Sequence, residues 1–374
     1  MVINTPMKHP MPTSGQPFAT LTPDTVLDAI DSLGFRTDGR LLALNSFENR
    51  VYRVDVEKTV EKTIEKTIKP ERKPAIESTI ALSGAALITQ IPERSTSPVP
   101  SRIIAKFYRA NRWTDDQILE EHAFVQSLVD NEIPAVPALK IGDQTLHTRG
   151  AMRLAVFECR GGRAPDLENE ETLLWLGRFI GRIHSVGARQ AFIHRPKHDV
   201  DQMAREPRDW LLQSNMIAPD LQAAWLAIAN AAVQQISAQF DRYPYQSIRL
   251  HGDCHAGNVL WTPDGPHFVD FDDARQGPAV QDLWMLLATE PEIRAQQLTA
   301  LLKGYRQFWA FDEQQLHLIE ALRAMRLLYY SAWIARRWED PAFVAAFPWF
   351  GSTRYWQDRI LELREQVAIM QELG

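Results

Sequence analysis

The chain has 374 residues, of which 45% are hydrophobic and 24% are charged, and its formal net charge is -6. This composition is that of a folded globular protein and excludes a disordered chain, a collagen or a coiled-coil rod. At about 150 residues per domain, the length suggests two domains or one large two-lobed unit. The mildly acidic balance gives no bulk attraction for nucleic acid or an anionic membrane, so we expect neither as a partner.

The first predicted element follows a flexible tail, which we expect at residues 1–20. Thr22 and Pro23 are residue types favoured at a helix cap and in the first helical turn, and Gly34 is typical of a helix end. The elements that follow predict a small lobe rich in strands: two strands in 41–56 around a polar turn at 45–49, a strand at 102–108, a helix from 113 to about 129, a hairpin over 138–147 and a strand at 152–158.

Residues 57–100 interrupt this small lobe. They begin with EKTVEKTIEKTI, in which one tetrapeptide is repeated three times. On a helix this repeat would stack like charges four residues apart, which weakens the helix. Five prolines and a Ser/Thr-rich stretch follow. We therefore expect a mobile surface insertion within an N-terminal lobe of residues 21–158.

The remaining residues, 159–374, are predicted to form a larger, mainly helical lobe. The glycine-rich sequence CRGGR at 159–163 separates it from the preceding strand. Apolar residues recur at helical spacing over most of the lobe, with an exception at 248–272. The expected fold class is α+β, with a small antiparallel-sheet N-lobe that carries one helix and a larger helical C-lobe.

The exceptional segment, IRLHGDCHAGNVLWTPDGPHFVDFDDA, contains the residues that suggest chemistry. His251, Asp253 and His255 would share one face of a strand and could bind a metal, but two glycines predict a loop instead. Cys254 beside His255 could be a nucleophile, although neighbours in sequence need not form a dyad in space. A third interpretation, phosphoryl transfer, accounts best for the spacing.

Asp253 and Asn258 have the spacing that separates the catalytic Asp from the metal-binding Asn in a kinase catalytic loop. There the Asp accepts the proton of the acceptor hydroxyl, and the Asn holds Mg²⁺ on the phosphates. A hairpin with a Pro-Asp-Gly-Pro turn follows and would return Asp270 to the side of Asn258. We therefore take Asp253 and Asp270 as candidate catalytic residues, and Asn258 and Asp270 as candidate Mg²⁺ ligands.

Four further residues of this region have predicted roles. Asp272 and Asp273 could tune the metal or be solvated, and we favour solvation. Asp282, at the next helix start, is expected to support the catalytic loop through backbone hydrogen bonds. Cys254 directly follows the candidate base, which suggests the hypothesis that oxidation or alkylation of its thiol blocks the site.

A kinase also needs groups that hold the nucleotide. Lys106 lies in an otherwise apolar strand and suits a lysine that pairs with phosphates, and such a buried lysine needs a carboxylate partner. The next helix offers Glu120 and Glu121, and we favour Glu121 because it shares the apolar face. Ser46 lies in the turn where a phosphate-covering loop is expected, although this turn lacks the G-x-G-x-x-G pattern. Ser46, Lys106 and Glu121 are the candidate ATP-binding residues.

These motifs resemble those of a known family. H-G-D-x-H-x-x-N followed by V-D-F-D-D is similar to the aminoglycoside phosphotransferase and choline kinase group, and LNSFENRVY and KFYR-x-x-RWT-x-DQILEEH resemble a bacterial branch of stress-response Ser/Thr protein kinases. The resemblance implies a two-lobed protein-kinase-like fold, ATP, Mg²⁺ and a cytoplasmic role in stress survival. It assigns Asp253 as proton acceptor, Asn258 and Asp270 as Mg²⁺ ligands, and Ser46 as an ATP contact.

The resemblance thus predicts an ATP-dependent Ser/Thr protein kinase. A small-molecule hydroxyl kinase acting on a choline-, homoserine- or aminoglycoside-like substrate stays open as the alternative, because its site chemistry is the same. Acceptor preference is expected to depend on the arginines and aromatic residues at 326–338 and 347–350. The expected partners are ATP and a protein substrate of unknown identity, and we expect a monomer.

The predicted compartment is the cytoplasm. The 2 cysteines are too few for a disulfide framework or a four-cysteine zinc site, which fits a reducing environment. The first 20 residues contain no apolar run typical of a secretory signal, and nowhere are there about 18 consecutive uncharged apolar residues that would predict a membrane span.

Overall fold

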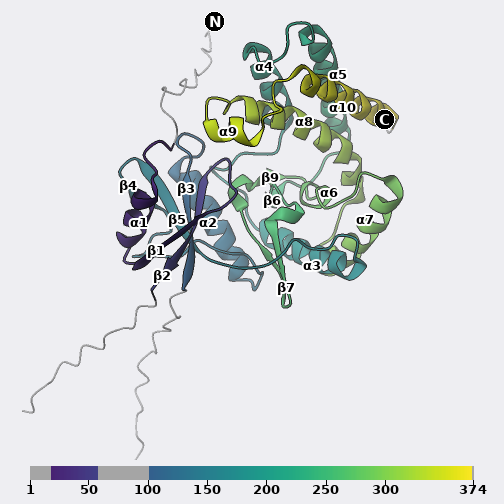
Figure 1. The fold of residues 1–374 in the computed structure, drawn as a ribbon. Helices are drawn as coiled ribbons and strands as arrows, with labels where there is room; N and C mark the ends of the chain where they lie inside the picture. Colours follow the sequence, from purple (N-terminus) through teal and green to yellow (C-terminus); the bar gives the residue numbers. More distant parts are fainter. Residues whose placement is uncertain (1–17, 58–100, 373–374) are drawn as a thin grey trace, which may run out of the picture.

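The computed structural model describes residues 18–57 and 101–372. The predicted flexible tail, up to residue 17, and the predicted mobile insertion, from residue 58, lie outside these residues. Figure 1 shows a smaller lobe built on a sheet and a larger, helical lobe. The predicted α+β, two-lobed fold class is thereby confirmed.

The N-lobe is a five-stranded antiparallel sheet of order β1-β2-β3-β5-β4 with helices α1 and α2 packed against it. Its elements are α1 (Pro23–Asp31), β1 (Thr37–Ala43), β2 (Arg50–Val56), β3 (Arg102–Tyr108), α2 (Asp115–Val129), β4 (His147–Arg149) and β5 (Met152–Glu158). The predicted cap of the first helix is confirmed, because the Thr22 hydroxyl accepts from the N–H of Thr25. Since β2 pairs with β3, the long segment between them joins two neighbouring strands.

One strand pairing differs from the prediction. Residues 138–147 do not form a regular hairpin. Only Ile141 and Gln144 form a bridge there, and Leu139 instead donates to Val156 of β5. His147 begins β4, which also pairs with β5. The apolar strand β5 offers more backbone hydrogen-bond partners than a short hairpin around the Gly-Asp turn would. The segment at Leu139 and the strand β4 therefore both pair with β5.

The C-lobe is mainly helical, as expected. Its elements are α3 (Glu170–Gly187), a π-helical turn (Asp201–Arg205), α4 (Glu206–Gln213), α5 (Gln222–Arg242), β6 (Ile248–Leu250), β7 (Val259–Thr262), β8 (Gly265–Phe268), β9 (Arg275–Gly277), α6 (Gln281–Trp284), α7 (Pro291–Tyr305), α8 (Ile319–Ala335), α9 (Pro341–Ala346) and α10 (Thr353–Glu372). Among the described residues, no helix is both long and apolar enough to cross a membrane.

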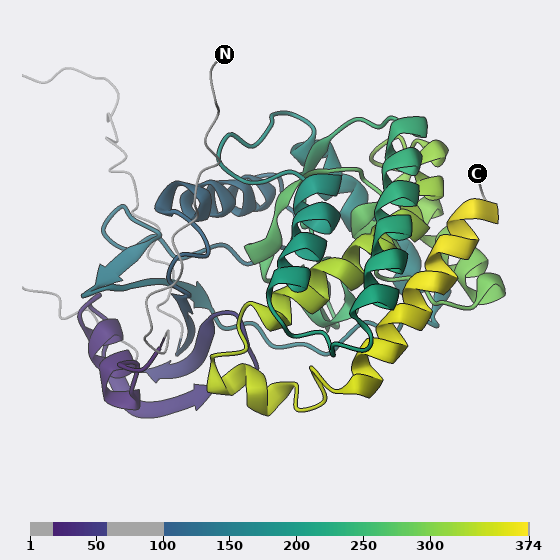
Figure 2. The same ribbon diagram turned by 90° about the horizontal axis from the view of Figure 1, so that it is seen from above.

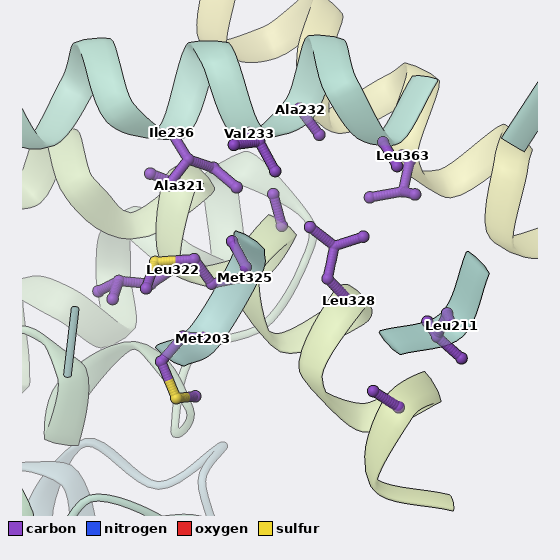
Figure 3. Packing of buried hydrophobic residues seen from close by; sticks show 14 of the residues in the cluster. Met203, Leu211, Ala232, Val233, Ile236, Ala321, Leu322, Met325, Leu328 and Leu363 are labelled. Atoms are coloured by element: carbon purple, nitrogen blue, oxygen red, sulfur yellow. The ribbon is translucent and has the colours of Figure 1, made fainter. Parts of the chain in front are cut away.

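The largest core of the C-lobe lies between α5, α8 and α10. Figure 3 shows Val233 and Ile236 of α5 facing Met325 and Leu328 of α8, with Leu363 of α10 at the edge. The apolar spacing on each helix places these side chains on one face, and their burial fixes α8 in position. Because α8 also lines the candidate site, this core determines where the site's helical wall lies.

The two lobes also meet away from their connection. Figure 2 shows α9, in yellow-green, beside the strands β1 and β2 at the edge of the N-lobe. Asp340, directly before α9, pairs with Arg50 of β2 and with Arg109 after β3. The turn between β1 and β2 therefore faces the C-terminal helices across the candidate site.

Candidate active site

The loop that follows β6 carries the candidate base Asp253, and we call it the catalytic loop after the sequence prediction. It is held by Asp282 of α6. The two carboxylate oxygens of Asp282 accept hydrogen bonds from the backbone N–H groups of His251 and Gly252, each at 2.8 Å. His184 of α3 lies 3.1 Å from the same carboxylate, and its other ring nitrogen lies 2.7 Å from the hydroxyl of Tyr305. The predicted supporting role of Asp282 is confirmed.

Gly252 brings the catalytic loop very close to the segment that follows β8. Its φ of +85° is a left-handed conformation that favours glycine. A Cβ atom at this position would lie 2.1 Å from the carbonyl oxygen of Asp273. The two loops that carry the candidate catalytic and metal-binding residues thus touch through their backbones.

Asp253 projects from this loop into the cavity described below. One of its oxygens accepts from Nη1 of Arg326 at 2.9 Å, and the other lies 3.5 Å from Nε2 of His255. Burial by itself would raise the pKa of Asp253, but the interactions with His255 and Arg326 outweigh it and hold the pKa well below its usual range. The carboxylate is therefore ionised at neutral pH.

Asn258 lies beside Asp253, and its amide donates to the Asp253 backbone carbonyl at 2.9 Å. The predicted hairpin forms as β7 and β8, and the N–H of Val269 bonds to the carbonyl of Asn258 at 3.0 Å. The next residue, Asp270, has φ 59° and ψ 61°, a left-handed conformation that is uncommon outside glycine. This sharp turn directs the chain away from the hairpin and leaves the Asp270 side chain 56% exposed.

The side chains of Asn258 and Asp270 fit Mg²⁺ by their chemistry. Mg²⁺ prefers oxygen ligands and usually keeps water and phosphate oxygens in its remaining positions. The described residues contain no group of three or more His, Cys, Asp or Glu that could hold a metal on its own. A metal bound here would therefore depend on substrate oxygens as well as on the amide and the carboxylate.

Lys106 reaches this end of the site from β3. Its Nζ lies 2.9 Å from Asp270 and 3.0 Å from Asp272. Burial alone would lower the pKa of Lys106, but these two carboxylates outweigh burial and raise it well above the ordinary value. No ion pair joins Lys106 to Glu121, although both are buried and Glu121 contributes to the field at the lysine.

The two glutamates of α2 have different surroundings. Glu120 accepts hydrogen bonds from the backbone N–H groups of Ile193, His194 and Arg195, so it ties α2 to the C-lobe. Glu121 faces the interior and is 4% exposed. Burial raises its pKa to about 7 despite the nearby positive charge of Lys106.

The prediction that Asp272 and Asp273 are solvated is wrong. Asp272 is buried and pairs with Arg112 as well as with Lys106. Asp273 pairs with Arg112 at 3.1 Å and with Arg275 at 2.8 Å. Adjacent acidic residues in sequence suggest a solvated surface, but here three basic residues pair with them, burying Asp272 and leaving Asp273 only partly exposed.

The turn between β1 and β2 forms a loop, Asn45–Asn49, over the site. Ser46 lines the cavity together with its neighbours in this loop. The Asn49 amide donates to the buried Asp272 carboxylate at 3.2 Å and its oxygen accepts from the N–H of Arg109 at 3.1 Å. Phe47 packs on Phe347 with ring centroids 5.1 Å apart. The loop lacks the glycines of a G-x-G-x-x-G pattern, and its position is set instead by these side-chain contacts.

Glu48 is the charged centre of these contacts, and sequence reasoning did not single it out. Its carboxylate pairs with Arg109 at 3.1 Å and with Arg337 at 2.6 Å, and it accepts from Nε1 of Trp333 at 2.6 Å. Arg109 also pairs with Asp340 at 2.7 Å. We call Glu48, Arg109, Arg337 and Asp340 the interlobe cluster, because it fastens the covering loop to the C-terminal helices.

These elements enclose one cavity of about 480 Å³. Asp253, Asn258 and Asp270 line this cavity. It also has an aromatic wall from the regions where the sequence predicted acceptor contacts, comprising Tyr329, Tyr330, Trp333 and Phe347. The structure thus brings Ser46 and the candidate base and metal ligands to one cavity. Lys106 and Glu121 are not among its lining residues, and Lys106 is linked to the cavity through its ion pairs with Asp270 and Asp272.

Cys254 does not share this cavity. It is 1% exposed and packs in the apolar core among Phe268, Phe271 and Leu283. Burial raises the pKa of its thiol well above the ordinary value, so little reactive thiolate forms. The hypothesis that thiol reagents block the site through Cys254 is not supported, because the Cys254 side chain is buried in the apolar core while its neighbour Asp253 lines the cavity.

Comparison with known proteins gives consistent results. Residues 93–319 match the model of the phosphotransferase enzyme family. Stress response kinase A of Escherichia coli (strain K12) is 40% identical over 355 residues, which cover 95% of each chain. Serine/threonine protein kinase RdoA of Salmonella typhimurium is 37% identical over the same share of both chains. An amicoumacin kinase, solved with AMP-PNP and Ca²⁺, superposes with a TM-score of 0.64 over 92% of both chains, and at 16% identity this likeness shows the fold alone.

Proposed function

The chain belongs to the phosphotransferase enzyme family, and we propose that it is a stress-response Ser/Thr protein kinase that transfers the γ-phosphoryl group of ATP to a protein hydroxyl. The observation that carries the proposal is the convergence of Asp253, Asn258 and Asp270 on one cavity roofed by the Ser46 loop. Identity of 40% over 95% of the chain to a kinase named for stress response supports the biological role.

In this proposal Asp253 accepts the proton of the acceptor hydroxyl as its oxygen attacks the γ-phosphorus. The low pKa of Asp253 keeps the carboxylate ionised and available. Asn258 and Asp270 would hold Mg²⁺, which when bound neutralises charge on the phosphates. Because Asp282 fixes the backbone ahead of Asp253, the base keeps a defined position relative to these ligands.

The nucleotide is held from the N-lobe side. Lys106 supplies a positive charge for the phosphates, and Ser46 with the backbone of its loop supplies hydrogen-bond donors. The buried Glu121 of α2 adds a favourable electrostatic interaction with Lys106, after those of Asp270 and Asp272. The hydrogen bond from Asn49 to Asp272 and the ion pair between Glu48 and Arg109 hold the covering loop close to the candidate metal-binding segment.

A small-molecule hydroxyl kinase is the second candidate. It is favoured by the cavity itself, whose volume of about 480 Å³ falls within the range of small-ligand sites, roughly 300–1,000 Å³. Its aromatic wall, which includes Tyr330 and Trp333, would also suit an apolar or cationic ligand. The catalytic groups would act identically on either acceptor.

The experiment that tests the proposal uses radiolabelled ATP with a generic protein substrate and, in parallel, a panel of small alcohols. We expect label in protein, reduced by roughly 10²–10⁴-fold in Asp253→Asn, a range typical of losing a general base. Label in a small alcohol and none in protein would favour the second candidate. Transfer that is unchanged in Asp253→Asn would contradict the assigned mechanism.

A further inference from the structure

Arg112 lines the cavity, but the proposed mechanism gives it no part. It lies in the connection between β3 and α2, directly after Asn111, whose φ of 62° is a left-handed conformation that Asn adopts more readily than most residues. The Arg112 side chain is only 10% exposed. A charge that is buried to this extent needs carboxylate partners within the protein.

Three carboxylates from two other segments surround the Arg112 guanidinium. Its Nη1 pairs with Asp272 and lies 3.8 Å from a carboxylate oxygen of Glu48, and its Nη2 lies 3.1 Å from Asp273. Glu48 belongs to the covering loop, and the two aspartates follow the candidate metal ligand Asp270. From the N-lobe, Arg112 therefore joins the loop that roofs the cavity to the segment that is proposed to hold Mg²⁺.

Asp272 is the partner that Arg112 shares with Lys106. Oδ1 of Asp272 lies 3.0 Å from Nζ of Lys106, whereas Oδ2 pairs with Arg112 and accepts from the Asn49 amide at 3.2 Å. The Asp272 backbone is fixed separately, because its carbonyl oxygen accepts from Nη2 of Arg195 at 2.5 Å. One buried carboxylate thus divides its charge between two cations, of which one is the proposed phosphate-binding lysine.

Nucleotide binding requires a change at Lys106. Its Nζ lies 2.9 Å from Asp270 and 3.0 Å from Asp272, so phosphate oxygens have to compete with two carboxylates for the same ammonium group. In the proposed function Asp270 turns its charge to Mg²⁺. Asp272 is then the remaining competitor, and its hold on Lys106 depends on how fully Arg112 neutralises it.

Resting on the proposed function, we propose that Arg112 is a positioning residue for nucleotide binding, which pairs with Asp272 and so leaves Lys106 available to the phosphates. Without the Arg112 charge, Lys106 is the one ion-pair partner that Asp272 retains among the described residues. Asp272 then holds the lysine more strongly against the phosphates. Arg112 therefore acts through Asp272, and it affects nucleotide affinity rather than proton transfer to Asp253.

The test is a double-mutant cycle on the full chain, in which calorimetric titration measures the Kd of a non-hydrolysable ATP analogue in excess Mg²⁺. The cycle comprises Arg112→Gln, Asp272→Asn and the double variant, and Arg112→Lys tests whether the charge alone suffices. Arg153→Gln is the matched control. Arg153 holds the same connection between β3 and α2, because it donates to the Trp113 carbonyl at 2.7 Å and pairs with Asp115 at 2.8 Å.

We expect Arg112→Gln to raise the Kd of the analogue about tenfold, a size typical of coupling between sites, whereas Arg112→Lys and Arg153→Gln stay close to the unsubstituted chain. In the Asp272→Asn background, Arg112→Gln should have little further effect, because the carboxylate through which it acts is gone. In the transfer assay, Arg112→Gln should raise the KM for ATP and leave kcat and the KM for the acceptor nearly constant. A merely structural defect would change all three.

Several outcomes would overturn the role of Arg112: an unchanged Kd in Arg112→Gln, an equal loss of affinity in Arg112→Lys, or a loss that persists in the Asp272→Asn background. Loss of binding in Asp272→Asn alone would overturn it as well, because Asp272 would then support nucleotide binding instead of competing with it. The double variant removes one charge of each sign, so its comparison with Asp272→Asn still decides the point if Arg112→Gln does not fold.

The same measurements separate this inference from the proposed function. A chain that binds the analogue as expected but transfers no phosphate to protein would retain the role of Arg112 and overturn the protein kinase. Transfer to protein with an unchanged Kd in Arg112→Gln would retain the kinase and overturn the role of Arg112. Failure of the unsubstituted chain to bind the analogue would overturn both proposals.

Discussion

Replacement of Gly252 by alanine tests how closely the catalytic loop must approach the metal-binding segment. The added Cβ would lie 2.1 Å from the Asp273 carbonyl oxygen, where real Cβ contacts are not shorter than 3.0 Å. The two backbones must therefore separate by about 1 Å, and displacement of this size can cost about 10²-fold in rate. We expect a fall of about 100-fold in kcat for phosphoryl transfer from radiolabelled ATP.

Gly39 provides a matched control for this substitution. Its φ of +82° is close to that of Gly252, but a Cβ there would meet nothing within 4 Å. Both alanine variants therefore carry the backbone cost of a left-handed residue, about 1–2 kcal/mol, which thermal unfolding reports. Only Gly252→Ala should lose activity. If both variants keep similar rates, the close approach does not set the position of Asp253.

Three further predictions concern the interlobe cluster, the cysteines and pH. Asp340→Asn should lower the free energy of unfolding by about 3 kcal/mol, because it removes one partner of a buried pair, whereas the same change in the exposed Asp358 should cost below about 0.5 kcal/mol. Urea denaturation measures both, and equal costs would count against the cluster. In a Cys159→Ser background, Cys254 should resist maleimide in the folded protein and react only after unfolding, as mass spectrometry would show. Rapid labelling of the folded protein with loss of activity would instead support the hypothesis that modification of Cys254 blocks the site. The pKa of Glu121 is raised from 4.5 to about 7, so the folded state holds a proton that the unfolded state loses, and stability from this group falls as pH rises through that range. Glu121→Gln should flatten this part of the pH profile of unfolding, and an unchanged slope would show that another group titrates there.

Much of the fold and part of the site could be predicted because the relevant signals are local. The Thr22 cap, the strand around Lys106 and the hairpin after Asn258 each depend on residues a few positions apart. The spacing between Asp253 and Asn258 likewise sets their separation on one loop. Such short covalent distances leave few alternative arrangements.

The rest of the site depends on partners that are distant in sequence. Asp272 is buried because Arg112, from the other lobe, neutralises it, and nothing in the run of acidic residues indicates this. Glu48 joins Arg337 only after the C-terminal helices return to the N-lobe.

The position of the covering loop has a consequence for how nucleotide enters. Its strands β1 and β2 belong to the N-lobe sheet, yet its side chains are fastened to α8 and α9 through Glu48 and Phe47. Arg109, which follows β3 of the N-lobe, also pairs with Glu48 and donates to the loop's backbone carbonyls, so the loop is tied to both lobes at once. Any separation of the lobes that admits nucleotide must therefore break ion pairs of the interlobe cluster, in contrast to a flexible glycine flap that lifts on its own.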